Sequence, residues 1–136
     1  MARTSIEAKA TKRPLAPAVA ANVALRGVME AGVVAAFGYW GYRYANSALG
    51  RTVLAVGVPA IGFGIWGAVD FHQLGRLAEP TRLVEELALS GLASFALWTV
   101  DQQTLSVALG AISIAHHLAV YATGERLLKD APPVVK

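Results

Sequence analysis

Two long uncharged apolar runs limit what this chain can fold into more than any other feature. Neither Thr52 to Val69 nor Gln102 to Gly124 contains an Asp, Glu, Lys or Arg residue. A helix needs about 20 mostly apolar residues to cross the hydrocarbon core of a bilayer, and uncharged runs of about 18 or more are typical of membrane spans. These runs therefore predict transmembrane helices over residues 52–70 and 102–124.

Two further apolar segments are interrupted by charged residues. Residues 18–42 contain Arg26 and Glu30, and residues 81–100 contain Arg82, Glu85 and Glu86. An ionised side chain at the centre of an inserted helix costs about 2.5–3.5 kcal/mol and less near the helix ends, so the surrounding apolar residues can offset it. We therefore expect an all-α polytopic membrane protein, a four-helix bundle with four transmembrane spans. The third helix is expected to start at residue 81, directly after Pro80.

The composition also indicates a membrane protein. Charged residues make up 15% of the chain and hydrophobic residues 55%, whereas a soluble domain carries about a quarter charged residues. The chain has no cysteine, which excludes disulfides, cysteine-ligated metal and thiol catalysis. The net charge of +3 is spread between apolar blocks, so membrane lipids rather than nucleic acid are the expected partners.

The distribution of basic residues predicts the orientation in the membrane. Residues 1–17 are expected to form a flexible basic tail, residues 18–124 the transmembrane domain and residues 125–136 a second tail. In the four-span arrangement, ten of the 12 Lys and Arg residues lie on the side of the two tails, and only Arg43 and Arg51 lie on the other. Because basic residues favour the cytoplasmic side, both termini are expected to be cytoplasmic.

The first and third predicted spans share a short pattern at an offset of 56 residues. Arg26 aligns with Arg82, and Glu30 aligns with Glu86. This pattern is compatible with a duplicated two-helix hairpin, in which the two copies are parallel repeats.

Several of these residues also occur in a pattern known from a protein family. The pattern comprises Leu25-Arg26, Glu30, Gly38-Tyr39-Trp40-Gly41, Gly57-Val58-Pro59 and Pro80-x-Arg82-Leu83-x-x-Glu86-Leu87. Over about residues 23–123 the chain resembles the YrdB-like family of small bacterial four-helix membrane proteins of unknown function. The resemblance implies a multi-pass protein of the bacterial inner membrane and carries no activity. The fourth span departs from the family pattern, because His116-His117 stands where a polar residue and an arginine are expected.

The ionisable residues of the spans are expected to form one polar cluster in the cytoplasmic half of the bundle. At a rise of about 1.5 Å per residue, nine ionisable residues fall in that half, including Asp70 and His72 at the end of the second span. The expected cluster consists of the other seven: Arg26, Glu30, Arg82, Glu85, Glu86, His116 and His117. Arg and Glu four residues apart lie on one helix face and can form ion pairs that hold the bundle together. The alternatives are a substrate or proton site built on Glu30 and Glu86, or a contact with lipid headgroups or a partner.

The adjacent histidines point to different helix faces, so we expect at most one to face the bundle interior. The favoured interpretation is a buried or interfacial histidine that donates to a backbone carbonyl, to Glu30 or to Glu86. A proton relay is the alternative, and haem ligation would require His72 or a second subunit for the other ligand. We expect no metal and no cofactor.

Small residues recur every four positions in three of the spans. These stripes are Gly27, Ala31 and Ala35; Ala60, Gly64 and Ala68; and Ala111, Ala115 and Ala119. Such stripes allow close helix packing, which we expect inside the bundle, and a surplus stripe could serve a homodimer or a larger membrane complex.

The chain contains no phosphate loop, dinucleotide fingerprint, zincin motif or nucleophile elbow. We therefore expect a protein that is not an enzyme, with a structural or accessory role in the membrane. The alternative functions are a small proton-coupled transporter or carrier that uses the carboxylates and a histidine, and a haem or quinone redox protein.

Overall fold

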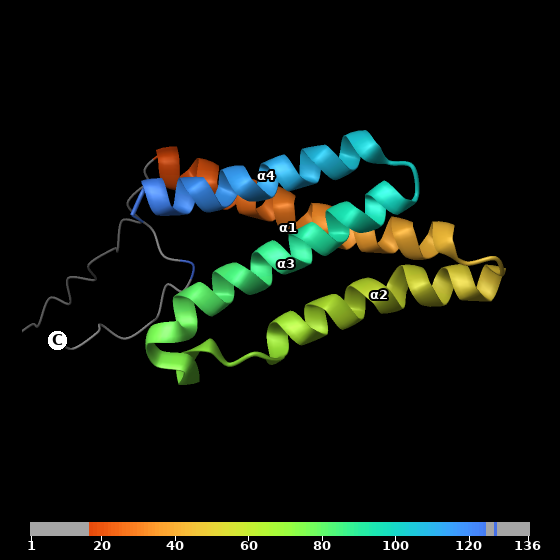
Figure 1. Ribbon diagram of the computed structural model, residues 1–136, viewed down its shortest axis with the longest axis horizontal. Helices are drawn as coiled ribbons and strands as arrows, with labels where there is room; N and C mark the ends of the chain where they lie inside the picture. Colours follow the sequence, from red (N-terminus) through yellow and green to blue (C-terminus); the bar gives the residue numbers. More distant parts are fainter. Residues whose placement is uncertain (1–16, 125–126, 128–136) are drawn as a thin grey trace, which may run out of the picture.

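The computed structural model describes residues 17–124 and 127, apart from the side chain of His72. Within these residues the chain forms four α-helices and one 3₁₀ helix (Figure 1): α1 Pro17–Tyr44, α2 Ala48–Ala68, η1 Phe71–Leu77, α3 Ala78–Thr99 and α4 Gln103–Ala122. The tails predicted before residue 17 and after residue 124 lie outside the described residues, except Leu127. All-α architecture is confirmed, and each predicted span coincides with one helix.

Helices α2 and α3 both begin earlier than predicted, for local reasons. Helix α2 starts at Ala48 because Ser47 caps it, its Oγ accepting a hydrogen bond from the Gly50 N–H at 3.0 Å. Helix α3 starts at Ala78, so the predicted start at residue 81 is wrong. Pro80 lies in the first turn of α3, where a residue without an N–H interrupts no helical hydrogen bond.

The helices run alternately between two ends of the molecule (Figure 1). The α1–α2 and α3–α4 connections lie together at one end, here called the turn end. The opposite end, here called the η1 end, contains the N-terminal end of α1, the C-terminal end of α4, and η1. Helix α1 packs against the other three α-helices, and α4 packs against α1 and α3. Short connections make helices that are neighbours in sequence antiparallel neighbours in space, as is seen here.

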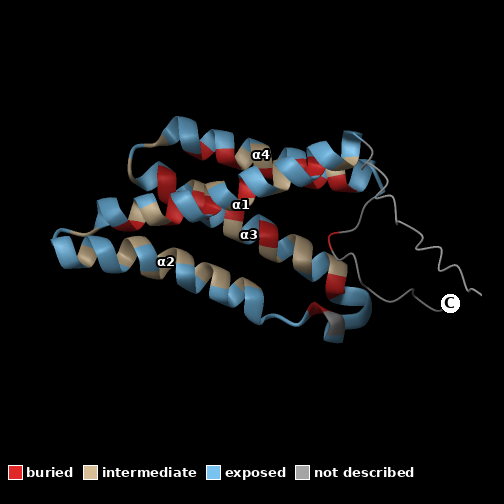
Figure 2. Ribbon diagram, turned by 180° about the vertical axis from the view of Figure 1, so that it is seen from behind, coloured by how far each residue is buried: buried red, intermediate tan, exposed pale blue. Residues whose placement is uncertain are grey.

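The apolar core lies between α1, α3 and α4, and α2 is peripheral. The core is formed by Val33, Ala36, Phe37, Ala93, Ala96, Leu97 and Leu109. Figure 2 shows the buried positions on these three helices, whereas α2 has none. Helix α2 approaches α1 closely at Gly41, where an added Cβ would overlap the backbone of Leu54.

The stripes of small residues do not pack inside the bundle, so that prediction is wrong. Eight of the nine residues are exposed, and Ala119 is half-buried. The helix contacts instead use other small residues, among them Ala36 on α1 and Ala93 and Ala96 on α3. These residues share a helix face with larger core side chains, and burial of that face determines which small residues are enclosed.

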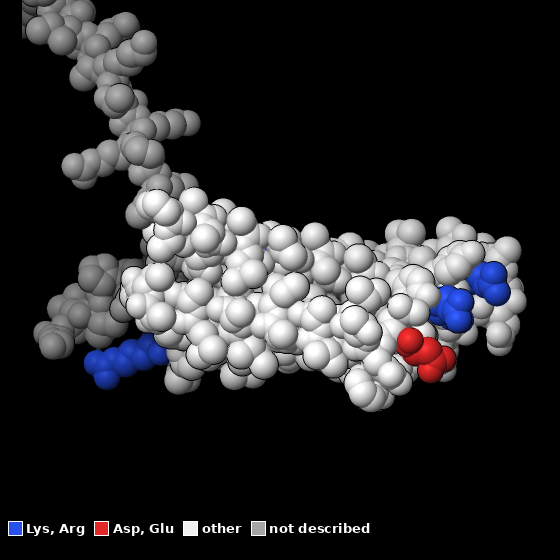
Figure 3. Space-filling model, turned by 90° about the horizontal axis from the view of Figure 1, so that it is seen from above, with Lys and Arg blue, Asp and Glu red and all other residues white. Residues whose placement is uncertain are grey.

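Helices α1, α2 and α4 are long and apolar enough to cross a membrane, judged by length and composition. Helix α3 is not in this group, because it carries Glu79, Arg82, Glu85 and Glu86 in its first half. On the face shown in Figure 3 the charged side chains lie at the two ends and leave an uncharged body between them. Such a distribution is typical of a protein whose middle lies in lipid.

Candidate functional site

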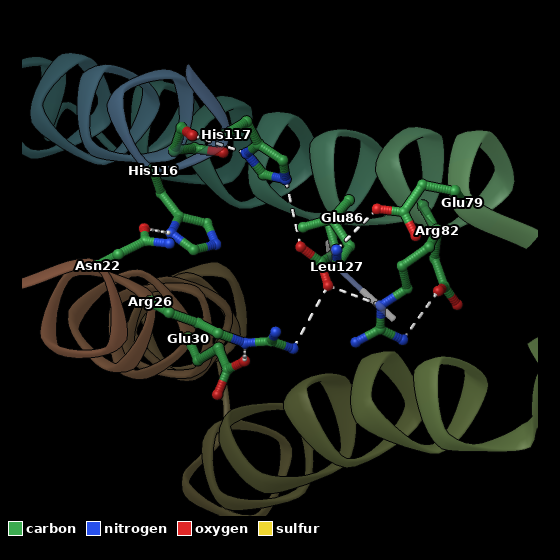
Figure 4. Close-up of polar contacts among 11 residues, drawn as sticks. Asn22, Arg26, Glu30, Glu79, Arg82, Glu86, His116, His117 and Leu127 are labelled. Carbon is green, nitrogen blue, oxygen red and sulfur yellow. Dashed lines mark hydrogen bonds and ion pairs between the residues drawn. The ribbon is translucent and has the colours of Figure 1, made fainter. Parts of the chain in front are cut away.

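The predicted ionisable residues meet at the η1 end of the bundle (Figure 4). Together with one residue that sequence analysis missed they form a group that we call the polar cluster: Asn22, Arg26 and Glu30 of α1, Arg82, Glu85 and Glu86 of α3, and His116 and His117 of α4. Side chains from three helices therefore contact one another at a single level of the bundle.

Glu86 has partners on all three helices. Its Oε1 accepts a hydrogen bond from Arg82 Nε at 2.6 Å and lies 3.5 Å from Arg26 Nη2. Its Oε2 lies 3.2 Å from His117 Nε2. The side chain is 1% exposed, so these partners replace the water that a carboxylate would otherwise need.

The two Arg–Glu pairs that the sequence pattern aligns form the same interaction in different surroundings. Arg26 Nε donates to Glu30 Oε1 at 2.8 Å, as Arg82 Nε does to Glu86. The Glu30 side chain is 33% exposed, whereas that of Glu86 is almost fully buried. Helix α3 packs against both α1 and α4, and Glu86 has partners on both of these helices, which enclose it. The pairing is confirmed, and the duplication itself stays a prediction.

His117 links α4 to α3. Its Nδ1–H donates to the backbone carbonyl of Ser113 at 2.7 Å, and its Nε2 faces Glu86. The favoured interpretation of a buried histidine bonded to a carbonyl and a glutamate is therefore confirmed for this residue.

His116 links α4 to α1. Its Nδ1–H donates to Asn22 Oδ1 at 2.9 Å, and its Nε2 is buried without a hydrogen-bond partner within the described part of the chain. His116 and His117 are 1% and 5% exposed, so the prediction that at most one faces the interior is wrong. Helix α4 contacts both α1 and α3, and each histidine face meets a different neighbour.

Arg82 lies between two aromatic rings as well as two carboxylates. Its guanidinium carbon is 4.7 Å from the Trp66 ring centroid and 5.0 Å from that of Phe71. Its Nη1 lies 3.4 Å from Glu85 Oε2. The rings stabilise the cation where water is scarce.

With all three carboxylates ionised and both histidines neutral, the polar cluster carries one excess negative charge. Two guanidinium groups, of Arg26 and Arg82, face the three carboxylates of Glu30, Glu85 and Glu86. A buried excess charge is costly, and a protonated His117 beside Glu86 removes it.

Asn22 is the member of the polar cluster that sequence analysis missed, although a signal was present. Asn22, Arg26 and Glu30 are spaced four residues apart, so they form one polar stripe on α1. A polar residue in an apolar span, in register with an ion pair, indicates an interior face.

The space beside the polar cluster is small. A cavity of about 10 Å³ is bordered by Glu30, Trp66 and Glu86, which is about the room one water molecule needs. Two larger grooves, of about 380 Å³ and 350 Å³, are lined almost entirely by apolar side chains nearer the turn end. No group of three His, Cys, Asp or Glu side chains that could hold a metal ion occurs among the described residues. The predicted haem partner, the His72 side chain, lies outside them.

Comparison with known proteins yields one match. A family model described as "Protein of unknown function (DUF2568)" matches residues 24–114, close to the span of the predicted resemblance. The YrdB-like name is not confirmed by this match. No curated protein and no solved structure matches the chain.

Proposed function

The chain belongs to the DUF2568 family of unknown function, and from this premise we propose that it is a four-span protein of the bacterial inner membrane. Its role is structural or accessory and not enzymatic. The polar cluster holds three helices together, and both ends of the chain are cytoplasmic.

One observation carries the structural role: the ionisable groups of the polar cluster interact mainly with one another. Glu86 contacts Arg82 on its own helix, Arg26 on α1 and His117 on α4. The contacts with Arg26 and His117 join different helices, and the adjoining cavity has room for about one water molecule. A side-chain network of this kind fixes which helix faces meet.

Two features support α3 as the fourth span. Its 22 residues extend about 33 Å, enough to cross the hydrocarbon core. Its arginine and two of its glutamates form ion pairs, which lowers the cost of placing them in lipid. The alternating helices then place the start of α1 and the close of α4 on the same side.

An accessory role also requires a partner. The peripheral α2 has no buried residue, so it offers its whole outer surface to lipid, to a second copy of this chain or to another membrane protein. Membrane lipids and a homodimer or larger complex are therefore the proposed partners.

The four-span topology can be tested by cysteine labelling, because the chain has no cysteine of its own. Ser47→Cys, in the α1–α2 connection, and Gln73→Cys, in η1, are exposed to a membrane-impermeant maleimide in intact cells. In intact cells we expect the maleimide to label Ser47→Cys and not Gln73→Cys. After the cells are opened, we expect it to label Gln73→Cys as well. A third variant with cysteine appended after Lys136 must behave like Gln73→Cys, and labelling of that terminus from outside would overturn the model of four spans.

A further inference from the structure

We propose that Glu86 and His117 form a proton-binding site, in which one proton between Glu86 Oε2 and His117 Nε2 links α4 to α3 at the η1 end of the bundle, and its release lets the two helices move apart at that end. This inference rests on the proposed structural role of the polar cluster and adds a ligand to it. The ligand is a proton.

The hydrogen-bond partners of His117 require this proton. A backbone carbonyl can only accept, so the 2.7 Å bond to Ser113 places one hydrogen on Nδ1. A carboxylate oxygen also only accepts, so the 3.2 Å contact of Nε2 with Glu86 requires a second hydrogen between the two atoms. That hydrogen makes the pair either imidazolium and carboxylate, or imidazole and carboxylic acid, with the same number of protons.

Loss of the proton removes the link. The imidazolium gives up its Nε2 hydrogen as H⁺ to water, the N–H electron pair stays on Nε2, and Glu86 remains a carboxylate. Two lone pairs then face each other at the former hydrogen-bond distance, which is repulsive. His117 is the only described side chain of α4 that bonds to Glu86, so α4 loses its polar link to the centre of the polar cluster.

The charged groups around Glu86 and His117 favour the bound proton and limit how many protons the site holds. Helix α1 contributes Arg26 and Glu30, and α3 contributes Arg82 and Glu85. With His117 protonated these charges balance. A second proton on His116 Nε2 would place a second imidazolium beside the first, because the two ring centroids are 5.1 Å apart, so the two histidines do not both carry an additional proton.

The geometry of the site favours a proton over any larger ligand. The adjoining cavity of about 10 Å³ admits about one water molecule. Arg26, which lies 3.5 Å from Glu86, and Glu30, which pairs with Arg26, are 31% and 33% exposed, so the buried pair is next to side chains that reach the surface of the bundle.

Glu86→Gln separates proton binding from structure. The glutamine amide carries its own N–H hydrogens, so it can donate to His117 Nε2 with no added proton while its oxygen still accepts from Arg82. The variant should therefore keep α3 and α4 together at every pH. Glu86→Ala removes the link at every pH and is the opposite control.

Two measurements on the full chain in lipid nanodiscs test the inference. The ring nitrogens of ¹⁵N-labelled histidine report the His117 hydrogens, with signals assigned through His116→Gln and His117→Gln. Spin labels at Val84→Cys on α3 and Leu118→Cys on α4, both exposed and close in sequence to the pair, report the helix separation in a chain without native cysteine. Both are followed from acid to alkaline pH.

We expect the His117 Nε2 signal to lose its hydrogen as the pH rises and the α3–α4 distance to lengthen over the same range. In Glu86→Gln both should stay constant. A wild-type chain whose His117 signals and distance do not change with pH would overturn the proton site, as would a Glu86→Gln chain that titrates like the wild type. If Glu86→Ala is destabilised while the His117 signals of the wild type do not change with pH, the structural role of the polar cluster stands and the proton site is refuted. Failure of the proton site can therefore be distinguished from failure of the structural role.

Discussion

Replacing Glu86 by alanine should destabilise this protein far more than the same change at Glu30. Glu86 is buried and has three charged or chargeable partners, Arg26, Arg82 and His117. Removing one member of a buried ion pair costs about 3–5 kcal/mol, because its partners are left buried and uncompensated. We expect Glu86→Ala to lose about that much free energy of unfolding.

Glu30→Ala is the matched control, because it removes the corresponding carboxylate from the other Arg-x-x-x-Glu pair. Its side chain is 33% exposed and its ion pair is with Arg26, so its removal leaves one partly exposed partner and the expected loss is about 0–1 kcal/mol, the range of a partly exposed pair. Both variants carry the same change in charge and helix propensity. Their difference therefore measures the links that Glu86 makes to other helices.

The assay is reversible unfolding of the purified variants in mixed micelles, followed by far-ultraviolet circular dichroism as the fraction of denaturing detergent rises. We expect the transition of Glu86→Ala at a clearly lower fraction than that of Glu30→Ala, which should nearly coincide with the wild type. Equal shifts for the two variants would refute the reasoning, since they would show that the enclosed position of Glu86 contributes nothing. An unshifted Glu86→Ala would refute the structural role itself.

The remaining predictions concern helix contacts away from Glu86 and use the same assay. Gly41→Ala should cost about 1–3 kcal/mol, because the new methyl group overlaps the backbone of α2. Gly27→Ala, with no atom within 4 Å of the new methyl group, should leave stability unchanged or raise it by up to about 1 kcal/mol; equal losses at the two positions would contradict this. Ser106→Ala should cost about 1 kcal/mol by removing the 2.7 Å hydrogen bond to a backbone carbonyl of α3, and a neutral effect would show that this bond adds nothing. Trp40→Phe removes the 3.1 Å hydrogen bond to Thr99 between α1 and α3, and we expect a loss of about 0.5–1.5 kcal/mol of stability. The same change made in a Thr99→Val variant, which already lacks this bond, should cause no further loss.

The positions of the helices could be predicted because lipid imposes a length on an apolar run. Each predicted span overlaps one observed helix, and the differences lie at the ends, where Ser47 and Pro80 act locally. The Arg–Glu pairs were also predictable, since residues four apart on a helix are neighbours whatever the helix packs against. Asn22 was missed although it lies in register with Arg26 and Glu30, because its partner His116 is on a helix far away in the sequence.

The faces that meet could not be predicted from periodicity. Helices α1, α2 and α4 are apolar over most of their surface, so their apolar residues give no preferred buried face, and small residues on these helices suggested contacts that the bundle does not make. The same uncertainty led to the wrong expectation for the histidines. Helix α4 lies against two helices at once, which allows adjacent residues about 100° apart both to be buried.

The sequence by itself determined that the chain forms long apolar helices, where they lie along it and which charges pair within a helix, because these depend on composition and on spacing along one helix. Only the tertiary structure decided that Glu86 is enclosed while Glu30 is not, and that His116 contacts Asn22 while His117 contacts Glu86. Those outcomes depend on which helices lie on either side of α3 and α4. The contacts join residues as far apart as Asn22 and His116, and no local pattern records them.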